Sequence, residues 1–126
     1  MRRNEWWLAA LAAAAGVVAG SGTALAQTGD VAKGADVYDD RCSGCHVIGG
    51  IGQGPNLAGV VGRRAGASPG FAYTPALKGS GLTWTPANLD RWLTGPPRVV
   101  PGTAMTVVVP DTAERRELIA YLATLK

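Results

Sequence analysis

The sequence predicts a small all-α domain of four to five short helices joined by long loops. Apolar residues recur at helical spacing near both ends of the chain, which is the pattern of helices with one buried face. Between them, residues 49–70 contain eight glycines and two prolines, a composition that excludes regular structure over any length. The three valines at 107–109 are strand-like, but Pro101 and Pro110 keep that segment short and unpaired.

The first 26 residues have the features of an export signal rather than of folded structure. Arg2 and Arg3 form a basic start, an alanine-rich apolar stretch covers residues 6–19, and Ala24-Leu25-Ala26 provides a small-residue cleavage site. We therefore expect cleavage before Gln27. The alternative is an uncleaved signal that anchors the domain to a membrane.

Residues 27–126 then form one domain of 100 residues. Much of it is glycine, proline and polar loop, so its own apolar core would be thin, and a buried apolar cofactor would supply the missing surface. Removing Arg2, Arg3 and Glu5 with the signal leaves ten basic and eight acidic residues, a net charge of +2. That charge is too small and too scattered for nucleic-acid binding.

The first predicted helix covers residues 31–42, with Asp30 as its N-cap. Gly34 is unusual inside it, because a helix glycine costs about 1 kcal/mol relative to alanine. We expect that this glycine permits the close approach of another helix.

Threonine followed by proline marks two further helix starts, at 74–75 and at 85–86. The first predicts a short turn through Leu77. The second predicts a helix to about Thr94, which Gly95-Pro96-Pro97 stops, and residues 98–110 follow as an ordered loop.

The last helix begins at Asp111, which forms a capping-box pattern with Glu114 three residues later. Its buried face follows the i, i+3, i+4, i+7 spacing and consists of Leu118, Tyr121, Leu122 and Leu125.

The chemistry of the chain is decided by the motif Cys42-Ser43-Gly44-Cys45-His46. C-x-x-C-H is the attachment pattern of c-type haem, in which two thiols bond to the porphyrin vinyl groups and the following histidine ligates the iron. Cysteines one helical turn apart can meet adjacent vinyl groups at one edge of the haem. No other cysteine or histidine occurs in the sequence.

Three other interpretations of this motif are weaker. A thioredoxin-like redox pair needs a strand–helix–strand context that the flanking sequence lacks. A structural zinc site has four ligands, usually cysteine or histidine, whereas this chain offers three. A local disulfide leaves His46 without a role.

The iron of a haem bound by one histidine has a second axial position, and residues 27–126 contain one methionine, Met105. A thioether is soft and neutral, so it stabilises ferrous iron and raises the reduction potential. It also closes the site to oxygen and peroxide. The alternative is that Met105 simply packs in the core, which is the usual role of methionine.

The chain resembles class I cytochromes c of the mitochondrial and soluble bacterial type over residues 34–125. The resemblance is carried by the helix at 34–38, the haem motif, and the segments Gly54-Pro55-Asn56-Leu57, Gly62-Arg63, Gly70-Phe71-Ala72-Tyr73-Thr74, Leu82-Thr83-Trp84, Pro101-Gly102-Thr103-Ala104-Met105 and Leu118-Ile119-Ala120-Tyr121-Leu122. It implies the cytochrome c fold, one haem c bound covalently through Cys42 and Cys45, and axial ligation by His46 and Met105.

The resemblance also assigns roles to residues around the haem. The Pro55 carbonyl would accept a hydrogen bond from Nδ1 of the ligating histidine and fix its ring. Arg63, Tyr73 and Trp84 would bind or neutralise the haem propionates. Thr103 would lie near one propionate. The alternatives are core packing for the two aromatic residues and a solvated surface charge for the arginine.

The chain departs from the family pattern in ways that bear on function. Trp92 stands where relatives usually carry a tyrosine that hydrogen-bonds the methionine sulfur, so the tuning of the potential from this position is open. The loop after the haem motif is shorter than in the mitochondrial proteins. The family's ring of lysines at the haem edge is sparse, which makes docking onto an acidic partner less secure, since residues 27–126 contain only Lys33, Lys78 and Lys126.

Together these features predict an electron carrier rather than an enzyme, exported to the periplasm as a monomer, with no small-molecule substrate. Its partners would be redox proteins that dock transiently at the exposed haem edge. The donor would be a quinol–cytochrome c reductase, and the acceptor a terminal oxidase, a photosynthetic reaction centre or a periplasmic reductase.

Two other functions are weighed against this one. A dedicated haem subunit of a periplasmic dehydrogenase would have the same chemistry, and a large apolar patch near the haem edge would favour it. A peroxidase-like enzyme or gas sensor is disfavoured, because no second histidine is present as an acid–base group.

Overall fold

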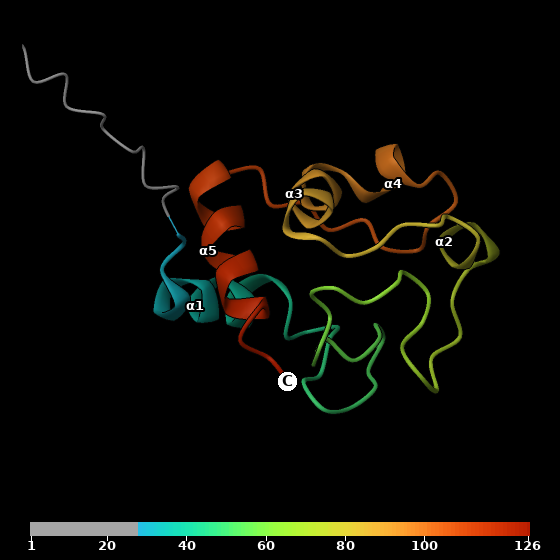
Figure 1. Cartoon of the computed structure of the whole chain (residues 1–126), viewed down its shortest axis with the longest axis horizontal. Helices are drawn as coiled ribbons and strands as arrows, with labels where there is room; N and C mark the ends of the chain where they lie inside the picture. The colour runs from blue at the N-terminus through green and yellow to red at the C-terminus, as the bar shows by residue number, and fades with distance from the viewer. Residues whose placement is uncertain (1–27) are drawn as a thin grey trace, which may run out of the picture.

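The computed structural model describes residues 28–126, so the predicted signal segment at 1–26 lies outside the described residues. In this part of the chain the helices are α1 Val31–Arg41, α2 Pro75–Lys78, α3 Pro86–Thr94, α4 Pro96–Val99 and α5 Thr112–Leu122 (Figure 1). No strand forms among these residues, and extended pairing is limited to a bridge between Arg64 and Thr83. The predicted all-α class with long loops is confirmed.

Within residues 28–126, none of the helices combines the length and the hydropathy that crossing a membrane requires. The valines at 107–109 do not pair as a strand, as predicted. Val109 is fully buried, and its N–H donates to the Leu93 carbonyl at 2.8 Å.

The helices at the two ends of the chain, α1 and α5, cross one another on one side of the molecule (Figure 1). Asp30 caps α1 as predicted, because its Oδ1 accepts from the N–H groups of Ala32 and Lys33 at 2.9 and 3.2 Å. A Cβ at Gly34 would overlap the Glu117 carbonyl of α5. The glycine therefore allows the helix contact predicted for it.

The capping box predicted at the start of α5 forms in one direction only. Asp111 Oδ1 accepts from the Glu114 N–H at 2.9 Å. The Glu114 side chain makes no hydrogen bond back to Asp111. Its Oε2 instead lies 2.9 Å from a guanidinium nitrogen of Arg41, and the two groups form an ion pair whose angles do not meet those of a hydrogen bond. Glu114 thus links the first turn of α5 to the last turn of α1.

Both threonine–proline starts are confirmed. The Thr74 hydroxyl accepts from the Leu77 N–H at 3.3 Å, and the Thr85 hydroxyl accepts from the Asn88 N–H at 3.1 Å. Helix α3 ends at Thr94 as predicted. The sequence predicts only the end of a helix at the prolines that follow, whereas in the structure they also begin α4. Proline has the backbone φ of a first helical turn, so one Gly-Pro-Pro segment can end one helix and start the next.

The loop at 49–70 is ordered by hydrogen bonds within itself and by hydrogen bonds to distant backbone. The Gly59 N–H donates to the Leu125 carbonyl at 3.0 Å, and the Gly62 N–H donates to the Trp84 carbonyl at 2.9 Å. The loop runs from beside the C-terminal end of α5 toward α2 (Figure 1). Residues of this loop and of the segment at 100–110 line the same cavity.

Candidate haem-binding site

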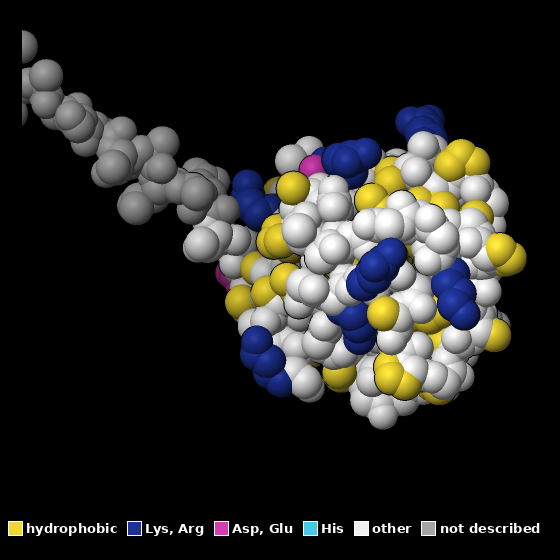
Figure 2. Space-filling model, turned by 45° about the vertical axis from the view of Figure 1, so that its right-hand side comes forward, with side chains coloured by type: hydrophobic (Ala, Val, Ile, Leu, Met, Phe, Trp, Pro, Cys, Tyr) yellow, Lys and Arg dark blue, Asp and Glu magenta, His cyan; other side chains and the backbone are white. Residues whose placement is uncertain are grey.

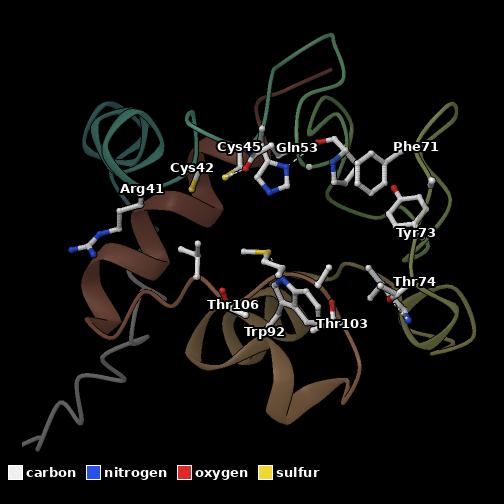
Figure 3. A pocket seen from close by; sticks show the side chains of 18 residues that line it. Arg41, Cys42, Cys45, Gln53, Phe71, Tyr73, Thr74, Trp92, Thr103 and Thr106 are labelled. Atoms are coloured by element: carbon white, nitrogen blue, oxygen red, sulfur yellow. Dashed lines mark hydrogen bonds between the residues drawn. The ribbon is translucent and has the colours of Figure 1, made fainter.

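A cavity of about 320 Å³ lies at the centre of the molecule. Its walls are the haem motif with Gln53 on one side, Phe71 to Thr74 at one end, and Trp92 with residues 103–107 on the opposite side (Figure 3). A second cavity of about 70 Å³ extends into the core and shares four lining residues with the first: Cys42, His46, Trp92 and Met105. The backbone therefore brings together segments from nearly the whole chain around one space.

The two cysteines follow directly from the end of α1. Cys42 is the C-cap of α1, so the predicted helix ends one residue earlier than expected. The turn continues because the N–H groups of Cys45 and His46 both donate to the Cys42 carbonyl, at 3.1 and 2.9 Å. Both thiols line the cavity and both are free, so the structure does not contain the alternative disulfide.

The two thiols differ in environment. Cys42 is buried, and burial raises the pKa of its thiol to about 11. Cys45 is exposed, and its Sγ donates to Gln53 Oε1 at 3.5 Å. Before any covalent modification, the Cys42 side chain is therefore a neutral thiol at neutral pH.

His46 is held by three neighbours, two at its ring and one at its backbone carbonyl. Its Nδ1 lies 2.9 Å from the Pro55 carbonyl oxygen, which can only accept, so Nδ1 is the donor and the neutral ring would have its free nitrogen at Nε2. A Cβ at Gly54 would collide with the ring, which shows how closely the loop backbone covers it. The Tyr38 hydroxyl donates to the His46 carbonyl at 2.7 Å. The contact predicted between Pro55 and the histidine is present.

Met105 reaches the cavity from the opposite wall. Its Sδ accepts a hydrogen bond from Nε1 of Trp92 at 3.3 Å. The Trp92 ring is buried and packs edge-on against Trp84, with the ring centroids 5.0 Å apart. The structure answers the open question about Trp92, because its indole N–H reaches the methionine sulfur.

The four residues predicted to face the propionates separate into three groups. Tyr73 and Thr103 line the larger cavity, whereas Trp84 lines only the smaller one. Arg63 lines neither, and its guanidinium donates to the carbonyls of Asn56 and Ala58 at 2.6 and 2.8 Å. In this arrangement Arg63 holds the loop that carries Pro55.

Gln53 and Thr106 line the cavity without having been singled out by the sequence. Neither lies in a periodic segment. Their only sequence signal is position, since each lies within two residues of a motif residue, Pro55 or Met105.

The donor atoms around the cavity match a covalent haem. One imidazole with a free nitrogen, one thioether and two free thiols face the same space. Between residues 28 and 126, no three or more Cys, His, Asp or Glu side chains are grouped so that they could hold a metal ion, so the zinc interpretation gains no support.

A cavity lined by an imidazole, a thioether and two thiols is typical of c-type haem proteins. The family model for cytochrome c matches residues 31–126. Cytochrome c2 of Rhodomicrobium vannielii is 46% identical over 100 residues, which cover 76% of this chain and 79% of that protein. Cytochrome c of Tetrahymena pyriformis is 43% identical over 99 residues, covering 77% of this chain and 90% of that protein.

The solved structure of cytochrome cH from Methylobacterium extorquens is similar to the fold described here. It is 44% identical in sequence, and it aligns with a TM-score of 0.73 over 76% of this chain and 99% of that one. The chain therefore belongs to the cytochrome c family, as a class I member of the soluble bacterial type.

Family membership confirms the cofactor and the general function. Cytochromes c carry one covalent haem c, here attached through Cys42 and Cys45, and they are electron carriers rather than enzymes. The protein is accordingly an electron-transfer haem protein.

Proposed function

We propose that this protein is a monomeric periplasmic carrier of single electrons, with His46 and Met105 as the axial ligands of its haem. It takes electrons from a quinol–cytochrome c reductase and delivers them to a terminal oxidase, a photosynthetic reaction centre or a periplasmic reductase. When bound, the haem supplies one iron that alternates between the ferrous and ferric states. The observation that carries the proposal is that His46 and Met105 line one cavity from opposite walls, together with both thiols.

The chain's own groups fix both ligands before any electron moves. The Pro55 carbonyl orients the imidazole and increases its basicity, which strengthens its bond to iron. The Trp92 N–H withdraws electron density from the Met105 sulfur and holds its orientation. With His46 and Met105 as its two protein ligands, a bound haem would leave no open site for oxygen or peroxide.

The walls of the cavity also accommodate the haem's charged edge. Tyr73 lies at one end of the cavity and Thr103 on the wall beside Trp92, and in this proposal their hydroxyl groups bind the propionates (Figure 3). Arg63 contributes its positive charge from the neighbouring loop, while Trp84 supports the Trp92 ring. Every residue predicted for the site thus has a role in this proposal.

Replacement of Met105 by alanine tests the ligation directly. We expect the long-wavelength absorption band of thioether-bound ferric iron to disappear and the reduction potential to fall on the order of 0.1 V, within the ~0.8 V range that axial ligands span. The haem should stay attached, because both cysteines remain. The matched control is Val108→Ala in the same loop, because Val108 is exposed and lines neither of the two cavities. An unchanged band in Met105→Ala would remove Met105 from the site.

The proposal places the working protein outside the cytoplasm as residues 27–126. It is supported by the small-residue site at 24–26 and by the capped start of α1 a few residues later. We expect intact-mass analysis of the periplasmic fraction to give the mass of residues 27–126 plus one haem. A species that retains residues 1–26 and partitions with membranes would contradict cleavage.

A second candidate function is that of a dedicated haem subunit of a periplasmic dehydrogenase. Exposed apolar side chains next to the cavity favour it: Val47, Ile48, Ile51, Val107 and Val108. Gel filtration of a periplasmic extract, followed by haem absorbance, separates the two. Elution at the size of a free 100-residue monomer supports the carrier, and comigration with a dehydrogenase activity supports the subunit.

A further inference from the structure

We infer that this protein meets its redox partner through an uncharged surface at the mouth of the haem cavity, and that the matching partner surface is uncharged and apolar rather than acidic. The inference rests on the proposed function and names the kind of partner that the site takes.

The mouth of the cavity is built from residues that line it and are also exposed. Apart from Arg41, these residues, which we call the rim, carry no charge: Cys45, Gln53, Ala72, Ala104, Thr106 and Val107. Cys45 and Gln53 lie on one side of the opening and Thr106 on the other (Figure 3). A partner that approaches the cofactor therefore first touches small, neutral side chains.

Arg41 is the only acidic or basic side chain apart from His46 in the cavity lining, and it already has a partner. Its guanidinium lies 2.9 Å from the Glu114 carboxylate, and each of the two side chains is 35% exposed. Such a pair adds little to stability, but it leaves almost no net charge beside the rim.

Exposed apolar side chains lie next to lining residues in the sequence, in one segment on each side of the opening. Val47, Ile48 and Ile51 follow the haem motif, and Val107 and Val108 follow Met105, with exposed fractions between 38% and 54%. Five of the six large exposed apolar residues of the described chain are in these two segments. This grouping next to one opening is typical of an interaction surface.

Apart from Arg41, no lysine or arginine side chain lines the cavity. Residues 43–110 contain one acidic residue, Asp90, which pairs with Arg115 at 2.8 Å. The basic residues of the same segment are all absent from the cavity lining: Arg63, Arg64, Lys78, Arg91 and Arg98. On the face shown in Figure 2, basic side chains are scattered among uncharged ones, and two of them lie next to each other.

The lack of net charge at the rim determines which kind of partner surface can bind there. An acidic surface placed on the rim would lose its hydration and gain no ion pair in return, which is unfavourable. An uncharged surface would bury the valines and isoleucines at both sides of the opening, which is favourable. Association through such contacts depends only weakly on ionic strength.

Electron self-exchange tests this inference with a defined probe, because a second copy of the haem-loaded protein presents the same rim. Ferrous and ferric protein are mixed and the exchange rate is measured by NMR line broadening. We expect the rate to change less than about twofold between about 10 mM and about 0.5 M NaCl, a range over which charge–charge interactions become screened. A rate that rises about tenfold or more with salt would overturn the inference.

Two variants with the same net charge locate the effect. Val107→Lys places a cation on the rim, so two copies repel one another and the rate at about 10 mM NaCl should fall about threefold and recover at high salt. Ala32→Lys adds the same charge in the exposed first turn of α1, about ten residues and some 15 Å of helix away from Cys42, and should leave the rate unchanged. Equal effects of the two variants would show that the rim is not the docking surface. A protein that carries no haem or exchanges no electrons would instead contradict the proposed function.

Discussion

Among single residues, the contact between Trp92 and Met105 has the most direct consequence for function. The sequence predicts that Trp92 stands near the methionine, but whether an indole can replace a phenol there depends on how α3 is turned relative to residues 101–105. That orientation follows from packing, since Trp92, Trp84 and Leu93 are all buried. The resulting 3.3 Å contact gives the sulfur a donor that is larger and more rigid than a tyrosine hydroxyl.

Removing that donor should lower the reduction potential. In Trp92→Phe the sulfur keeps its full electron density and stabilises ferric iron better. A hydrogen bond is worth about 1 kcal/mol, and a tenfold change in a one-electron equilibrium is about 59 mV, so we expect a fall of roughly 20–60 mV. Spectroelectrochemical titration measures it.

The control for this prediction is Leu93→Ala, which removes buried volume on the same helix without touching the sulfur. If the two variants shift the potential equally, the shift is due to packing rather than to the hydrogen bond.

Among the secondary-structure elements, α5 does more than pair with α1. Arg115 of α5 is only 7% exposed, and it donates to Asp90 of α3 at 2.8 Å and to the carbonyls of Val109 and Pro110 at 3.0 and 2.8 Å. These bonds fix the end of the segment that carries Met105. The sequence does not reveal this role, because an arginine among charged helix residues has the pattern of a solvated side chain.

Loss of these Arg115 hydrogen bonds should release the segment that carries Met105 before the helices unfold. We expect Arg115→Met to reduce the free energy of unfolding by about 3 kcal/mol, because it leaves a buried carbonyl and a carboxylate without their partner. In urea, the thioether–iron band should disappear at a lower concentration than the helical circular dichroism.

Arg116→Met is the matched control, since Arg116 is exposed on the same helix and should change stability by less than about 0.5 kcal/mol. Coincident loss of the band and of the helical signal in Arg115→Met would show that Arg115 supports the whole fold and not the methionine segment in particular.

For the whole molecule, predictions from sequence are more accurate where a feature depends on residues close by in the chain than where it depends on contacts between distant segments. Helix caps and starts at Asp30, Thr74 and Thr85 are correct because they depend on neighbours within three residues. The carbonyl partners of Arg63 and the ion pair of Glu114 were not predicted, because they depend on how distant segments meet. The haem motif is an exception, since its chemistry is local although its cavity is not.

The long loops make the fold depend on its cofactor. A cavity of about 320 Å³ occupies the position of a core, and its apolar walls stay in contact with water unless a group fills it. An ordinary domain of this size has a free energy of unfolding of only about 5–15 kcal/mol, so the loss of that burial is a large part of it. The polypeptide alone should therefore be marginal at best.

Blocking haem attachment tests this dependence. We expect the double variant Cys42→Ser/Cys45→Ser, purified without haem, to lose most of its helical circular dichroism and its cooperative thermal transition, while the haem-loaded chain melts in a single step. Serine is close in size to cysteine, so the two substitutions by themselves remove little packing. A haem-free variant that still melts cooperatively near the temperature of the loaded protein would mean that α1, α3 and α5 form a sufficient core without the cofactor, and that the cavity closes when it is empty.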